Sequence, residues 1–286
     1  MTRLRNSWEL AKTSWGVLRS DKTLAVFPVV GGIVSLIVLL IFAGLAATTG
    51  GLTDDSTEGF EAIGYVFVVI GYIALAFVSV YFQAALVAAA DRSLRGENTS
   101  VGHGFSAATG RIYRILPWAI VVATVSIILQ WLEDRGFIGQ IVSNLLGAAW
   151  SILTFLTVPV IVLEDVGPIT ALKRSGTLLK QTWGENIIAQ IGIGLLGFLL
   201  AIPGVIVIAI GIAVGGAPAV VTAVVIGGAW LAIVAVVMSA LSGIYKTALY
   251  RYVVDGTAPG AFASVDLAHA FGTRKSRGTG GGFSNN

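Results

Sequence analysis

Six apolar stretches, each long enough to cross a lipid bilayer, restrict the fold of this chain more than any other feature. A membrane-spanning helix needs about 20 predominantly apolar residues. The runs that meet this length are Leu24–Thr48, Ala62–Ala90, Ile112–Leu132, Phe137–Leu163, Ile187–Ala213 and Ala219–Val254. The last run would be about 54 Å long as a single helix, so we expect it to tilt, break or project beyond the lipid. The sequence predicts an all-α, polytopic membrane protein with six transmembrane helices.

The composition agrees with a chain whose surface faces lipid. Charged residues make up 12% of the sequence, against about 25% in soluble domains. There is no cysteine, and His103 and His269 are the two histidines. This excludes disulfides and thiolate metal sites and argues against a histidine zinc site. We therefore expect no metal ion and no cofactor.

Basic residues in the connecting segments set the orientation. Of the 18 Lys and Arg residues, all except Arg135 fall on one side of the predicted spans. Cytoplasmic loops are enriched in Lys and Arg, so both termini are predicted to be cytoplasmic. The net charge of +3 then reflects topology and contact with anionic lipid, and we expect no nucleic acid partner.

Three basic segments have the spacing of an amphipathic helix, and each comes directly before a pair of spans. Such helices lie in the membrane interface, with Trp at headgroup depth and basic side chains toward anionic lipid. The apolar stripes are Leu4, Trp8, Ala11, Trp15 and Leu18; Val101, Phe105, Ala108, Ile112 and Ile115; and Ile169, Leu172, Gly176, Leu179 and Trp183. We predict three hairpins, each preceded by a cytoplasmic amphipathic helix, with Trp8, Trp15 and Trp183 as interfacial anchors.

The three units also end alike. A carboxylate residue marks the inner end of the second, fourth and sixth spans, and a glycine suited to a helix C-cap follows it each time. This predicts one membrane domain, residues 1–272, with a weak three-unit repeat at about 1–97, 98–166 and 167–256. Residues 273–286 are basic and glycine-rich, and we expect them to be disordered.

Two local phrases carry a resemblance: SWELAKTSWGVLRSDKTLAVFP, from Ser7, and PVIVLEDVGPITALKRSGTLL, from Pro159. With the six-span layout, they resemble a group of prokaryotic membrane proteins of unknown function. That group is itself similar to the membrane domain attached to some glycerophosphoryl diester phosphodiesterases. The resemblance implies a prokaryotic cytoplasmic membrane and carries no catalytic residues to this chain. The phosphodiesterase domain itself would need a soluble barrel, for which the chain has no room.

Two groups of charged residues near the inner ends of the spans are candidate site residues. Basic side chains beside an anionic surface attract lipid headgroups, which makes five of them candidate headgroup ligands: Arg111, Arg114, Lys173, Arg174 and Lys180. The alternative is that these five only enforce orientation. A second group could form ion pairs that hold the inner ends of the hairpins together: Asp91, Glu164, Asp165, Lys246 and Arg251.

Pro203 and Gly204, midway along the fifth span, form a candidate helix break. The pair could mark the discontinuous helix of a transporter site. A simple kink is the alternative we favour, because no acidic residue lies nearby to bind an ion. The run GIGLLG at Gly192–Gly197 matches a dinucleotide-binding motif in its letters, but it lies within a span rather than between a strand and a helix. Close helix packing explains its glycines better.

The spans contain few strongly polar residues, which limits the classes of function. They are Gln83, Gln130, Asn144 and Gln190, and we expect interhelical hydrogen bonds from them, with the lining of a cavity as the alternative. With no nucleophile–base pair, metal cluster or phosphate-binding loop, we expect no enzyme. The leading hypothesis is a non-catalytic module that scaffolds or regulates a membrane partner or organises anionic lipid. The alternative is a transporter or channel for a small or lipid-like solute, which a polar cavity at mid-membrane would favour.

Overall fold

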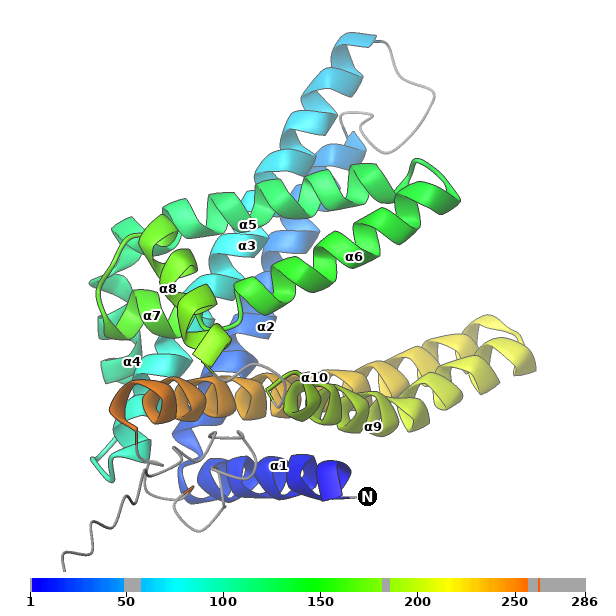
Figure 1. Cartoon of the computed structure of the whole chain (residues 1–286). Helices are drawn as coiled ribbons and strands as arrows, with labels where there is room; N and C mark the ends of the chain where they lie inside the picture. Colours follow the sequence, from blue (N-terminus) through cyan, green and yellow to red (C-terminus); the bar gives the residue numbers. More distant parts are fainter. Residues whose placement is uncertain (1, 49–57, 182–185, 257–261, 263–286) are drawn as a thin grey trace, which may run out of the picture.

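The computed structural model describes residues 2–48, 58–181, 186–256 and 262, and in these ranges the chain is helical and contains no strand (Figure 1). The helices are α1 (Thr2–Ser20), α2 (Thr23–Thr48), α3 (Glu58–Leu94), α4 (Val101–Thr109), α5 (Ile112–Glu133), α6 (Phe137–Leu153), α7 (Thr157–Leu163), α8 (Pro168–Gln181), α9 (Asn186–Val214) and α10 (Ala217–Asp255). The prediction of an all-α chain is confirmed for this part of the protein. The tail at 273–286 lies outside it.

Six helical segments are long and apolar enough to cross a membrane. They are α2, the Ile63–Leu94 part of α3, α5, α6 with α7, the Leu196–Val214 part of α9, and α10. The six predicted runs correspond to these segments in order. Large apolar side chains such as Leu40 (64% exposed) and Ile138 (77% exposed) cover their surfaces, as expected for helices surrounded by lipid. The protein is therefore a multi-pass membrane protein.

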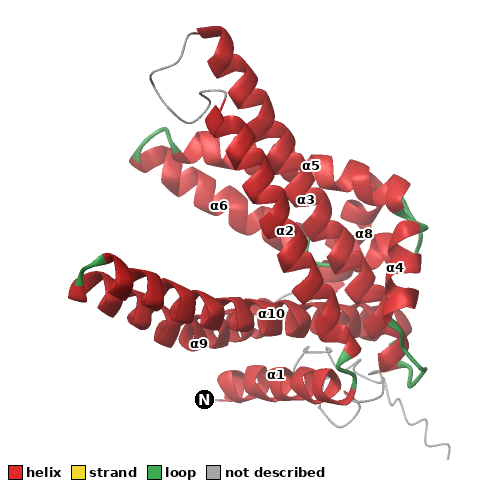
Figure 2. Ribbon diagram, turned by 180° about the vertical axis from the view of Figure 1, so that it is seen from behind, coloured by secondary structure: helices red, strands yellow, loops and turns green. Residues whose placement is uncertain are grey.

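The spans pack in neighbouring pairs, α2 with α3, α5 with α6 and α9 with α10. The three pairs meet at one end and diverge toward the other (Figures 1 and 2). Much of the buried core lies where they meet, including Ala84–Ala90 of α3 and Phe155–Val162 around α7. We call this region the charged end, because α3, α7 and α10 finish there close to carboxylate residues, namely Asp91, Glu164 and Asp255.

α10 is a single unbroken helix of 39 residues, although about 20 residues suffice to cross a bilayer. Most of its residues from Ala240 to Tyr250 are buried within the protein at the charged end. Gly243 allows this close packing, since a Cβ at that position would lie 2.4 Å from Leu86 Cδ2 on α3. Of the three outcomes expected for the long sixth run, a break does not occur. Its extra length continues into the protein core instead.

The fourth span is interrupted, where the sequence predicted one continuous run. α6 ends at Leu153 and α7 begins at Thr157. The buried Ser175 of α8 bridges the interruption, because its hydroxyl donates to the Leu153 carbonyl (2.7 Å) and accepts from the Leu156 N–H (3.2 Å). These bonds satisfy backbone groups that would otherwise be unpaired in an apolar environment. The turn in the fourth span is therefore stabilised by a residue that comes later in the chain.

α9 continues as one helix through Pro203 and Gly204, so the candidate break is absent from it. A proline inside a helix lacks an N–H and disturbs the carbonyls of the preceding turn. The indole Nε1 of Trp230, on α10, donates a hydrogen bond to the Leu200 carbonyl in that turn (2.8 Å). The neighbouring helix thus satisfies a backbone group beside the proline, and the helix does not need to open.

Small residues set the contact between α9 and α10. A Cβ at Gly211 would lie 2.1 Å from the Cβ of Ala223, and one at Gly227 would lie 2.6 Å from the Gly204 carbonyl oxygen. Gly197, the last residue of the GIGLLG run, packs against Met238 in the same way. The run lies inside α9, so helix packing accounts for Gly197 and the turn needed by a dinucleotide is not formed.

The short helices α1, α4 and α8 precede the three pairs, but the buried face of α8 differs from the stripe predicted for it. Ala171, Ser175 and Leu178 are buried, whereas Ile169 is 71% exposed. The buried face is turned toward α7 because Ser175 binds the interruption in the fourth span. The predicted stripe used apolar character alone and therefore excluded this serine.

α1 lies along α9 and α10 (Figures 1 and 2). Ala11 and Leu18 of its predicted stripe are buried, but Trp15 is 47% exposed. The side chain of Trp8 and the whole of Trp183 lie outside the described residues. A position of α1 in the membrane interface therefore stays a prediction.

Candidate functional site

A network of ion pairs joins the helices at the charged end. Asp91 of α3 is 3% exposed and accepts hydrogen bonds from Arg251 of α10, at Nε (2.5 Å) and Nη2 (2.9 Å). It also accepts one from Nη2 of Arg95 (2.8 Å), the residue directly after α3. Charge-assisted pairs with two bonds are among the stronger hydrogen bonds in proteins. One buried carboxylate therefore holds α10 against α3.

Asp165, the second residue after α7, binds the basic residues at the start of α5. Its Oδ1 lies 2.9 Å from Nη1 of Arg114 and 3.6 Å from Nε of Arg111. Asp165 has a φ of 53°, in the left-handed region that aspartate adopts more readily than most residues. The connection between α7 and α8 is thus tied to α5.

Glu164, the residue before it, binds two other helices. Its Oε1 accepts a hydrogen bond from Nε of Arg174 on α8 (3.2 Å) and another from the hydroxyl of Tyr250 on α10 (3.0 Å). The two adjacent carboxylates therefore contact three different helices. Each carboxylate is paired with arginine, and Glu164 also accepts a hydrogen bond from the Tyr250 hydroxyl. The arrangement is suited to holding helix ends together, since every carboxylate in it already has partners.

The residues predicted to pair at the inner face separate into four that join this network and one that does not. Asp91, Glu164, Asp165 and Arg251 are members of it. Lys246 is half-buried and forms no ion pair with any described residue. Its Nζ lies 5.1 Å from the ring centre of Phe155 instead, a distance suited to a cation–π contact.

The five candidate headgroup residues also divide into two sets. Arg111, Arg114 and Arg174 are paired with carboxylates, so their charge is largely compensated within the protein. Lys173 and Lys180 are exposed on α8 and form no ion pair in the described part of the chain. These two lysines are the members of the group whose charge remains available to an anionic ligand.

Some residues of the network were not predicted. Arg95 had a usable signal, because an acidic and a basic residue four positions apart on a helix are neighbours on its surface. Tyr250 and Ser175 had none. Tyr is common in apolar helices such as α10, and Ser is common in basic segments such as α8. The partner of each lies far away in the sequence, so no local pattern marks the contact.

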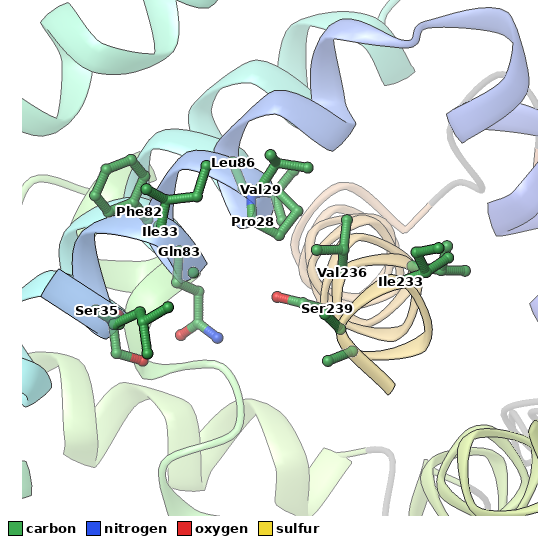
Figure 3. Close-up of a pocket in the computed structure, with 17 residues that line it drawn as sticks. Pro28, Val29, Ile33, Ser35, Phe82, Gln83, Leu86, Ile233, Val236 and Ser239 are labelled. Atoms are coloured by element: carbon green, nitrogen blue, oxygen red, sulfur yellow. The ribbon is translucent and has the colours of Figure 1, made fainter. Parts of the chain in front are cut away.

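Polar residues inside the spans have different surroundings. Gln130 of α5 accepts a hydrogen bond from the Tyr72 hydroxyl of α3 (2.7 Å), so it links two helices as expected. Gln83 lines a cavity of about 650 Å³ between α2, α3 and α10 (Figure 3). Asn144 is exposed on α6, and the side chain of Gln190 lies outside the described residues.

Among the residues that the structure describes, no group of three or more His, Cys, Asp or Glu could hold a metal ion. His103 contacts Arg92, with Nδ1 3.1 Å from Nη1. The carboxylates of the network have arginine partners, as described above. The carboxylates of the network are therefore used in ion pairs.

Comparison with known protein families finds one family whose model matches the sequence. A model described as "Family of unknown function (DUF6159)" matches residues 62–260, which is more than half of the chain. The chain belongs to this family. The part that matches DUF6159 contains all of the ion pairs described above, from Asp91 to Arg251. No curated protein and no solved structure matches the chain, and no link to glycerophosphoryl diester phosphodiesterases is shown.

Proposed function

We propose that this protein is a non-catalytic module of a prokaryotic cytoplasmic membrane that organises anionic lipid at its inner face and scaffolds or regulates a membrane partner. Both termini and the charged end would lie on the cytoplasmic side, as the distribution of Lys and Arg favours. The observation that supports the proposal most is the division of charge on α8. Arg174 is paired with Glu164, whereas Lys173 and Lys180 are exposed and have no ion pair within the described residues.

In this proposal the paired arginines and the exposed lysines have different roles. Each of the three helix pairs would form a hairpin in the membrane. The arginine–carboxylate pairs would hold these hairpins in a fixed arrangement. α8 packs against α7 through its buried face, so its lysines stand at defined positions on the opposite face. A basic side chain close to an anionic membrane surface contributes about 1 kcal/mol to binding. Exposed Lys12 and Arg19 on α1 add positive charge to the same inner face.

The charges of α8 provide the experiment. We expect the double variant Lys173→Gln/Lys180→Gln to carry fewer bound anionic lipids than the parent protein in native mass spectrometry. A loss of about 2 kcal/mol from two lysines corresponds to roughly thirtyfold weaker binding. The control is Lys173→Arg/Lys180→Arg, which keeps both charges and should retain the lipids. An unchanged lipid count in the glutamine variant, inserted correctly, would show that these lysines set topology only.

One observation favours the alternative of a transporter or channel, namely the cavity that Gln83 lines. Its walls are mostly apolar, so it suits a lipid-like solute better than an ion. This alternative predicts that the protein, reconstituted into vesicles, speeds the movement of a fluorescent phospholipid between leaflets. Movement at the rate of protein-free vesicles would count against it.

A further inference from the structure

The cavity between α2, α3 and α10 begins where α10 separates from α3. At the charged end the two helices are held together by the contact of Gly243 with Leu86 and by the pair of Asp91 with Arg251. One turn before Gly243, the side chain of Ser239 already faces the cavity. The opening is therefore bounded by tight packing on one side rather than produced by loose packing along the whole helix.

The walls of this cavity have no charged side chain. Among its lining residues, four have polar side chains: Ser35, Ser79, Gln83 and Ser239. The amide of Gln83 and the hydroxyl of Ser239 extend toward one another from α3 and α10 (Figure 3). The remaining lining residues are apolar or glycine, so the cavity has a small polar region on otherwise apolar walls.

Neither Gln83 nor Ser239 is hydrogen-bonded to another described residue. Gln130, also an amide within a span, has the Tyr72 hydroxyl as its partner. An amide without a partner in an apolar environment is unfavourable by several kcal/mol, and no bulk water is present in the hydrocarbon to satisfy it. The group that binds Gln83 must therefore come from outside the described chain.

The depth of Gln83 indicates which group that is. It lies eight residues before Asp91 on α3, which is about 12 Å along the helix axis. The polar headgroup region on each side of a bilayer is about 5–7 Å thick. Taking Asp91 at the outer boundary of that region, Gln83 lies about 5–7 Å inside the hydrocarbon. The polar groups of a glycerolipid closest to this depth are the ester carbonyls that join its acyl chains to glycerol.

We propose that the cavity holds one acyl chain of a membrane glycerolipid, with the Gln83 amide and the Ser239 hydroxyl donating hydrogen bonds to its ester carbonyl. The volume is within the range of about 300–1,000 Å³ found for small-molecule sites. Apolar lining residues such as Ile33 (56% exposed) and Ile233 (60% exposed) are open to the surroundings, so a chain can enter from the bilayer. This site is separate from the lysines of α8 and does not depend on their role.

The experiment uses the purified full chain and a phosphatidylcholine with a photoactivatable diazirine in one acyl chain. The zwitterionic headgroup separates this site from the anionic lipid proposed for α8. After illumination, peptide mapping should find the label on the cavity segments of α2 and α10. Gln83→Leu should lower this labelling about fivefold, the effect of one net hydrogen bond. Asn144→Leu, which removes an exposed amide outside the cavity, should leave it unchanged.

Two further measurements make the outcome decisive. Ser239→Trp, which fills the cavity, should abolish labelling of α2 and α10 while thermal unfolding shows that the protein remains folded. A dialkyl ether analogue of the probe lacks ester carbonyls and so loses the acceptor of both Gln83 and Ser239; it should label the parent protein more weakly than the ester probe labels Gln83→Leu. Labelling that is spread evenly over all lipid-facing helices, or that is the same in both cavity variants as in the parent, would show that the cavity holds no acyl chain and would overturn the proposal.

Discussion

The carboxylate of Asp91 on α3 binds the guanidinium of Arg251 on α10 through two hydrogen bonds, of 2.5 and 2.9 Å, although 160 positions separate the two residues. The Asp91 side chain is 4% exposed and that of Arg251 is 24% exposed. This pair joins the first pair of spans to the last. It is therefore the contact on which the arrangement of the charged end depends most.

Asp91→Asn should lower the thermal unfolding temperature in detergent strongly. Removing one member of a buried ion pair is unfavourable by on the order of 3–5 kcal/mol, and the remaining pair of Arg251 Nη1 with Asp255 (3.4 Å) offsets part of this loss. The tryptophan fluorescence of the native chain can report the transition. The control is the double variant Asp91→Leu/Arg251→Met, which removes both charges and should recover most of the loss. A single variant as stable as the parent would mean that the pair does not hold α3 and α10 together.

Asp165→Asn should have a small effect on stability and a larger one on lipid binding. The Asp165 side chain is 48% exposed, and pairs that are this exposed contribute about 0–1 kcal/mol. Asn also adopts the left-handed conformation readily, so the backbone is not strained. The change releases Arg111 and Arg114, and native mass spectrometry should then show additional anionic lipids. A lipid count that stays the same would show that released arginines at this position do not bind headgroups.

The neighbouring glycines at positions 227 and 228 of α10 should differ sharply in their tolerance of a side chain. A Cβ at Gly227 would lie 2.6 Å from the Gly204 carbonyl oxygen, whereas a Cβ at Gly228 would have no atom within 4 Å. Gly227→Leu should therefore separate α9 from α10 and lower the unfolding temperature, and Gly228→Leu should change it little. Equal effects of the two variants would contradict the close packing described here.

Lys246→Met should leave the protein as stable as before or more stable. A cation is unfavourable by about 2.5–3.5 kcal/mol at the centre of a span and by less near its end, where Lys246 lies, and the contact with Phe155 returns about 0.5–2 kcal/mol of this. Thermal unfolding measures the difference. A marked loss of stability would show that Lys246 has an acidic partner outside the described residues.

The positions of the six spans could be predicted from the sequence because a bilayer requires continuous apolar length, which is a local property. The interruption after Leu153 could not. Thr154, Phe155 and Leu156 are ordinary residues for a membrane helix, and the turn there depends on the hydroxyl of Ser175, 19 positions after Leu156. A bond between distant segments leaves no periodic signal in either of them.

Several residues of the charged end could be predicted from the sequence, but the pairs that they form could not. The gathering of charge at one end of the spans follows from membrane topology, so Asp91, Glu164, Asp165 and Arg251 were recognisable as candidates. Which carboxylate binds which arginine depends on the packing of the helices. The sequence therefore did not distinguish the paired Arg174 from Lys173 beside it, which has no ion pair with a described residue.

The orientation of the charged end in the membrane is the central claim, and cysteine labelling tests it most directly. The native chain has no cysteine, so single cysteines can be introduced at exposed positions on opposite sides. Asn98→Cys lies near the charged end, before α4, and Asp134→Cys lies in the turn between α5 and α6. With a membrane-impermeant maleimide on intact cells, the account predicts labelling of Asp134→Cys at once and of Asn98→Cys only after the membrane is opened. Labelling of Asn98→Cys in intact cells, with Asp134→Cys protected, would contradict it.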